Sequence, residues 1–121
     1  MSHRTAAMIA ALIAGMPAGA ALAHAFLDHA VPAVGSTVSA APVEIRLFFS
    51  EAVEPLFSGV ELANVDGAAI ATGATVIDPR DPMQLVLKVP PLSPGRYRVR
   101  WHVASVDTHR TEGDFTFEIR P

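Results

Sequence analysis

The 121-residue chain contains no cysteine, which excludes disulfide bonds and thiolate metal ligands. It is also poor in charge, because charged residues make up only 17% of it and its formal net charge is −3. A slightly acidic chain without a basic run repels phosphate backbones and anionic lipid headgroups. Nucleic-acid binding and electrostatic docking on membranes are therefore not expected. The length allows a single domain.

The N-terminal segment has the pattern of a secretory signal peptide. Arg4 supplies a positive charge ahead of an apolar stretch over residues 5–20, which is short and rich in alanine and glycine. Such a stretch is a poor candidate for a membrane span, although an uncleaved anchor remains the alternative. The pattern predicts export to the periplasm, with no membrane insertion after cleavage.

The cleavage site decides which residue begins the mature chain. Ala21-Leu22-Ala23 has the small-x-small pattern of a signal-peptidase site, which predicts a signal peptide at 1–23 and a mature domain at 24–121. His24 would then be the first residue. A cut after Ala25 satisfies the same pattern and would discard this histidine, so the cleavage rule alone leaves both sites open.

Residues 24–121 alternate apolar and polar side chains with period two and hold no sustained helical period, which predicts an all-β domain. Six or seven short strands of this kind favour a Greek-key sandwich or barrel of immunoglobulin-like size. A hairpin is expected at Asp66-Gly67, with a return strand over 68–77, and Met83 is expected in the core. The inward positions of the clearest strands are Val43, Ile45, Leu47, Phe49, Tyr97, Val99, Trp101, Val103, Phe115, Phe117 and Ile119.

Two places in the sequence could bind a metal. An N-terminal His24 would bring an α-amine and an imidazole into one chelate ring. Asp107 and His109 lie two residues apart between two strands, and in an extended segment such residues point to the same side. The resulting nitrogen and oxygen donors favour Cu(II), with zinc and nickel as alternatives. Taken alone, an Asp-x-His sequence is usually a solvated turn.

Several short motifs follow one another along the mature domain: His24–Ala30, Pro32, Gly35-Ser36, Phe49–Glu51, Tyr97–Trp101, Ser105–His109 and Gly113–Phe117. In this order and spacing they resemble the CopC copper-resistance family across residues 24–121. The resemblance implies a seven-stranded Greek-key β-barrel that holds one Cu(II) per chain, with His24, Asp107 and His109 at the ligand positions and Glu51 as an acidic residue close to the copper. It also implies a non-catalytic periplasmic role in copper resistance, homeostasis or delivery, with an inner-membrane partner of the CopD type.

The chain also departs from parts of that family. Members with a Cu(I) site carry a methionine-rich loop, whereas after the leader this chain keeps only Met83. Phe26 stands at the third mature position, where many members have histidine. These differences predict a single site for Cu(II), because one thioether is a weak basis for binding Cu(I).

The other histidines of the mature domain have simpler interpretations, and two other functions remain open. Asp28 and His29 are expected to face solvent, and His102 shares its strand face with three arginines, so it is expected to be a surface residue. One alternative function is a small copper monooxygenase that uses the N-terminal histidine. The other is a β-sandwich interaction module that binds no metal.

Overall fold

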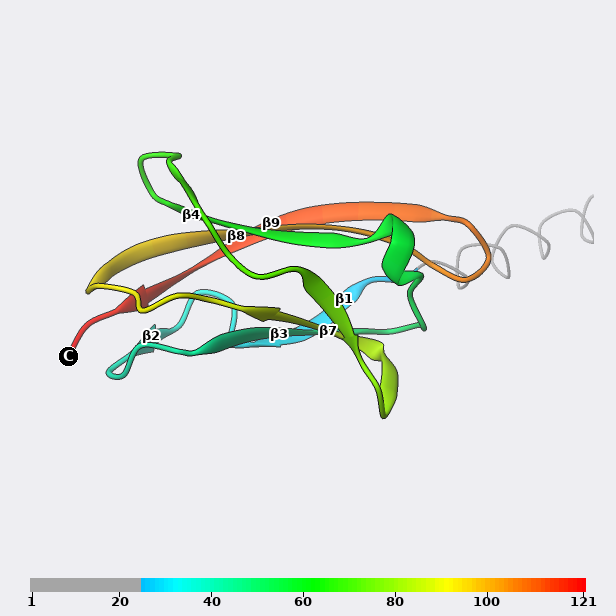
Figure 1. Ribbon diagram of the computed structural model, residues 1–121, viewed down its shortest axis with the longest axis horizontal. Coiled ribbons are helices and arrows are strands. Elements are labelled where there is room, and N and C mark those ends of the chain that lie inside the picture. The colour runs from blue at the N-terminus through cyan, green and yellow to red at the C-terminus, as the bar shows by residue number, and fades with distance from the viewer. Residues whose placement is uncertain (1–24) are drawn as a thin grey trace, which may run out of the picture.

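The structure, a computed structural model, describes residues 25–121, which form a two-layer β-sandwich (Figure 1). The sheets have the strand orders β1-β3-β7-β6 and β2-β9-β8-β4-β5. The all-β class and the sandwich arrangement are confirmed. The predicted signal peptide and His24 lie outside the described residues. The elements are β1 (Leu27–Val31), β2 (Thr37–Val38), β3 (Glu44–Phe49), the 3-10 helix η2 (Pro55–Phe57), β4 (Gly59–Asn64), β5 (Ala69–Ile70), β6 (Thr75–Asp78), β7 (Asp81–Lys88), β8 (Gly95–Ala104) and β9 (Arg110–Ile119).

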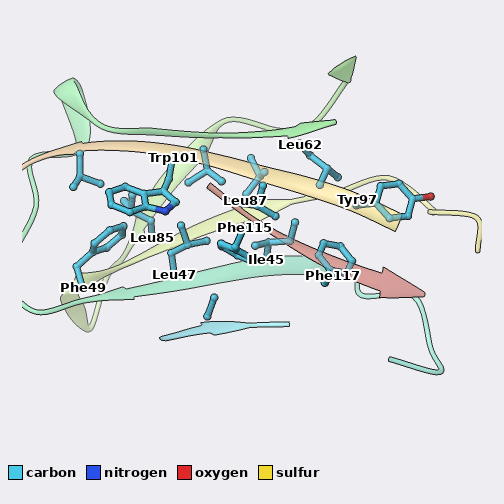
Figure 2. Close-up of a cluster of buried hydrophobic side chains, with 14 of the residues drawn as sticks. Ile45, Leu47, Phe49, Leu62, Leu85, Leu87, Tyr97, Trp101, Phe115 and Phe117 are labelled. Carbon is cyan, nitrogen blue, oxygen red and sulfur yellow. The ribbon is translucent and has the colours of Figure 1, made fainter. Parts of the chain in front are cut away.

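The core lies between the two sheets and is built from the inward positions predicted for β3, β8 and β9 (Figure 2). Burial of these apolar side chains is the main force that joins the layers. At one end of the core, Phe49 and Trp101 meet edge to face with ring centroids 5.3 Å apart. At the other end, Tyr97 stacks on Phe117 at 5.6 Å. Within the described chain, no helix is long and apolar enough to cross a membrane.

Three sequence-based placements were wrong. The segment 68–77 does not form one return strand, because β5 pairs with β4 whereas β6 pairs with β7 in the opposite sheet. The small residues between β5 and β6 provide little apolar surface to keep the chain on one sheet. Met83 is 42% exposed, since it lies near the start of β7, beyond the fully buried Leu85. Val43 precedes β3 and is exposed.

One end of the sandwich collects segments that are distant in sequence. The start of the described chain, the segment 50–57 and the turn between β8 and β9 all lie at this end (Figure 1). Val53 forms an isolated β-bridge with Ser105, and its N–H donates to the carbonyl oxygen of Pro82 at 3.1 Å. We call this region the donor end, because it carries Asp107 and His109.

Candidate metal centre

The β8–β9 turn brings the two predicted donors of the Asp-x-His motif together. The Ser105 N–H donates to the carbonyl oxygen of His109, and the Thr108 N–H donates to that of Ser105, both at 2.9 Å. Thr108 has φ +73°, a left-handed conformation that β-branched residues seldom adopt. The donors therefore converge through a tight turn, and the extended geometry expected from their spacing was wrong.

The contact between the donors is close. His109 Nδ1 lies 3.2 Å from Asp107 Oδ2, and the two side chains are 51% and 39% exposed. Ser105, for which no functional role was predicted, is only 1% exposed and donates its hydroxyl to Asp107 Oδ1. The Ser105 hydroxyl, and after it the imidazole of His109, hold the pKa of the Asp107 carboxyl below its ordinary value. A serine two residues before an aspartate in a turn is the signal that could have indicated this hydrogen bond.

The chain that follows His24 reaches the same hairpin. Ala25 is 1% exposed and belongs to the hydrophobic core. Thr111, the second residue of β9, donates its hydroxyl to the Ala25 carbonyl oxygen at 2.6 Å. The adjacent Phe26 N–H donates to Ser50 Oγ at 2.9 Å, and the Ser50 N–H donates back to the Phe26 carbonyl oxygen at 2.8 Å.

Glu51 is half-buried and follows Ser50, so it also belongs to the donor end. Across residues 25–121, however, no three His, Asp or Glu side chains come close enough together to hold a metal ion. Glu51 therefore does not complete a three-donor group with Asp107 and His109. A site at this hairpin needs donors from elsewhere, and the sequence offers His24, which immediately precedes the described residues.

The two remaining histidines of residues 25–121 lie where the sequence indicated. His29 is exposed, contacts Asp28 Oδ2 through Nδ1 at 2.7 Å and stacks on Phe48 with ring centroids 4.1 Å apart. His102 is exposed on the outer face of β8, with its ring directly over Gly59. A Cβ atom at Gly59 would lie 2.7 Å from His102 Cε1, so a larger residue there would displace this exposed ring.

A small β-sandwich with a histidine–aspartate pair on an end turn, beside the start of its first strand, is a candidate metal-binding domain of the non-thiolate class. The family model described as the CopC domain matches residues 27–120. The chain belongs to the CopC family.

Individual relatives agree with this assignment. Protein YobA of Escherichia coli (strain K12) is 42% identical over 99 residues, which cover 81% of this chain and 80% of YobA. Copper resistance protein C of Pseudomonas syringae pv. tomato is 38% identical over 114 residues, which cover 88% of this chain and 90% of that protein. The crystal structure of CopC from Methylosinus trichosporium OB3b has a TM-score of 0.76 at 32% identity, covering 81% of this chain and 95% of that one.

Proposed function

We propose that this protein is a non-catalytic periplasmic carrier of Cu(II) that acts in copper resistance, homeostasis or delivery and takes one ion per chain. In this proposal the ligands are the amine and imidazole of His24, the imidazole of His109 and the carboxylate of Asp107, with Glu51 as a nearby acidic group. The observation that carries it is the 3.2 Å distance between His109 Nδ1 and Asp107 Oδ2. This pair lies at the donor end, where Thr111 donates a hydrogen bond to Ala25.

The chemistry of the donors suits the proposed cargo. Imidazole, amine and carboxylate groups match the preference of Cu(II), and the described chain has no thiolate to favour Cu(I). Both side chains of the pair are partly exposed, so an ion can reach them from solvent. The turn and the Ser105 hydroxyl hold the Asp107 carboxylate in place before metal arrives, which reduces the ordering that binding requires.

The burial of Ala25 supports cleavage before His24. Its methyl group belongs to the core and its carbonyl oxygen accepts the Thr111 hydroxyl. A cut after Ala25 would remove the methyl group and replace this acceptor with solvent. We therefore expect intact mass to identify His24 as the first residue of the exported protein.

Isothermal titration with Cu(II) on the processed protein tests the proposal. The matched control carries one methionine ahead of His24, which converts the amine ligand into an amide nitrogen and separates the free amine from the imidazole. Affinity should fall by orders of magnitude in the control. Equal affinity in both forms would remove the amine from the ligand set, and no binding in either form would favour the metal-free interaction module.

Two further measurements address the oxidation state and the alternative of an enzyme. Ascorbate with a Cu(I) chelator of moderate strength should strip the metal, while the chelator alone should not. Retained Cu(I) would point to a missed site that includes the exposed Met83. Oxygen-dependent sugar oxidation by the copper-loaded protein would instead support the monooxygenase.

The proposed CopD-type partner needs its own experiment. Membranes that contain such a transporter should take up copper from the loaded protein faster than from free Cu(II) at the same free-ion concentration. Equal rates with and without the protein would overturn this partner.

A further inference from the structure

We propose that Thr111 and Ser50 form a clamp that positions the N-terminal metal ligand. This inference rests on the proposed function, because it concerns how His24 reaches the pair made by Asp107 and His109. Neither hydroxyl residue is itself a metal ligand in this proposal. Both act on the two residues that follow His24.

The clamp consists of three hydrogen bonds to consecutive residues. Thr111 Oγ1 donates to the carbonyl oxygen of Ala25 at 2.6 Å. The Phe26 N–H donates to Ser50 Oγ at 2.9 Å, and the Ser50 N–H donates to the Phe26 carbonyl oxygen at 2.8 Å. The near-complete burial of Ala25 adds a packing contact at the same point. The start of the chain is therefore held by side chains from two other segments as well as by its own strand pairing.

The location of the clamp gives it a role in metal binding. Thr111 lies two residues after His109, so the atom that fixes Ala25 belongs to the strand that continues directly from a proposed ligand. Consecutive Cα atoms are about 3.8 Å apart, so the residue bonded to Ala25 starts from a point that is already fixed on this strand. Binding sites work when their donors are held within about 0.5 Å of the productive geometry, which a free chain end does not provide.

The test uses the processed protein and single substitutions that remove one hydroxyl each. Thr111→Val keeps the size of the side chain, Thr111→Ser keeps the hydroxyl, and Ser50→Ala removes the acceptor of the Phe26 N–H. Thr116→Val is the matched control, because it makes the same change on the same strand but further from the donor end. Cu(II) affinity should fall roughly 10-fold or more in Thr111→Val and Ser50→Ala, as for other groups that orient metal ligands.

Two readouts separate positioning from general stability. Electron paramagnetic resonance should show an altered or mixed copper signal in Thr111→Val and the wild-type signal in Thr111→Ser and Thr116→Val. In the metal-free protein, hydrogen exchange of the Phe26 amide should accelerate at least 10-fold in Ser50→Ala, while the amide of Val99 in the centre of β8 stays protected.

The outcomes distinguish the clamp from the proposed function. If wild type binds Cu(II) and both hydroxyl-deleted variants match its affinity and signal, the clamp is wrong and the function stands. If wild type binds no Cu(II), the proposed function and the positioning role fall together. Rapid exchange of the Phe26 amide in the wild-type protein would also overturn the clamp.

Discussion

Side-chain hydrogen bonds to the backbone close local turns at one end of the sandwich and join distant segments at the other. At the far end from the donor turn, the Tyr97 hydroxyl donates to the carbonyl oxygen of Ser93, four residues away. Asn64 Oδ1 there accepts the N–H groups of Asp66 and Ala68, so each of these contacts closes a local turn. At the donor end, Thr111 reaches a residue 86 positions away in the sequence.

The difference shows at which end side chains, rather than strand pairing alone, link segments that are distant in sequence. The far end carries an open hollow of about 470 Å³ lined in part by Pro91, Pro94 and Tyr97, and its side-chain hydrogen bonds stay within a few residues. The donor end ties the start of the chain, the segment after β3 and the β8–β9 hairpin together. A substitution at the far end should therefore alter stability alone, whereas one at the donor end should also alter the proposed metal binding.

The largest effect is expected from His109→Ala. Copper affinity should fall by more than the roughly 10- to 100-fold that follows the loss of an outer-shell partner, because His109 is one of the proposed ligands themselves. Titration with Cu(II) measures the affinity, and electron paramagnetic resonance should show one nitrogen fewer. Asp107→Ala should weaken binding less. His29→Ala is the control, and a loss of affinity there with none in His109→Ala would reverse the assignment.

A second substitution tests how tightly β8 and β9, the strands that join the two ends, pack against each other. A Cβ atom at Gly113 would lie 2.6 Å from Cζ2 and 2.9 Å from Cε2 of the buried Trp101 ring. Gly113→Ala should lower the free energy of unfolding by about 1–3 kcal/mol, because a rigid ring in a packed core must shift. Denaturant unfolding measures the loss. Gly73→Ala is the control, since its Cβ would meet Lys88 at an ordinary 3.6 Å.

Tyr97→Phe tests the far end alone. It removes the hydroxyl that donates to Ser93 and should lower the free energy of unfolding by about 1 kcal/mol. Copper affinity should not change, because this hydrogen bond does not reach the donor turn. Measuring unfolding and Cu(II) titration on the same preparation checks both parts. A weaker copper affinity would show that the two ends are coupled after all.

The smallest effect concerns the pH dependence of the metal-free protein. Hydrogen bonding from Ser105 and then His109 lowers the folded-state pKa of Asp107, so folding favours the ionised carboxylate. The resulting stability should be fully present above the ordinary aspartate pKa of about 4 and should be lost as the pH falls through the lower folded-state value. Unfolding curves of wild type and Asp107→Asn should therefore converge in acid. Ser105→Ala should weaken this pH dependence, and an unchanged profile would contradict the role of its hydroxyl.

The sequence predicted the core well because strand alternation directly reflects which face is buried. The four inward residues of β8 are all buried, and the outward Arg98 pairs with Asp114 across the neighbouring strand. Alternation does not specify how far the core extends, so Met83 and Val43 were misplaced at strand ends. Alternation also does not specify which sheet a short strand joins. Here β6 joins the sheet of β1, β3 and β7 because it pairs with β7.

The contact between Asp107 and His109 was predicted from their spacing, but the backbone geometry that produces it was not. Sequence spacing indicated that Asp107 and His109 could meet, but the turn depends on the left-handed backbone at Thr108, which residue preferences do not favour. The contributions of Ser50 and Thr111 depend on contacts between distant segments. A single sequence carries no local pattern for such contacts, so the structure was needed to find them.

The hydrogen bond from Thr111 to Ala25 also closes a long loop of the chain, which affects the conformational entropy. A covalent link closing a loop of 86 residues would remove disorder from the unfolded chain worth on the order of 4–5 kcal/mol. A single hydrogen bond supplies only about 1 kcal/mol, so it cannot by itself act as such a link. His24 directly precedes Ala25, and His109 lies two residues before Thr111. An ion held by both histidines would therefore be a removable cross-link that closes a loop of nearly the same length. Copper would then raise the melting temperature of the domain, and a chelator would reverse the increase.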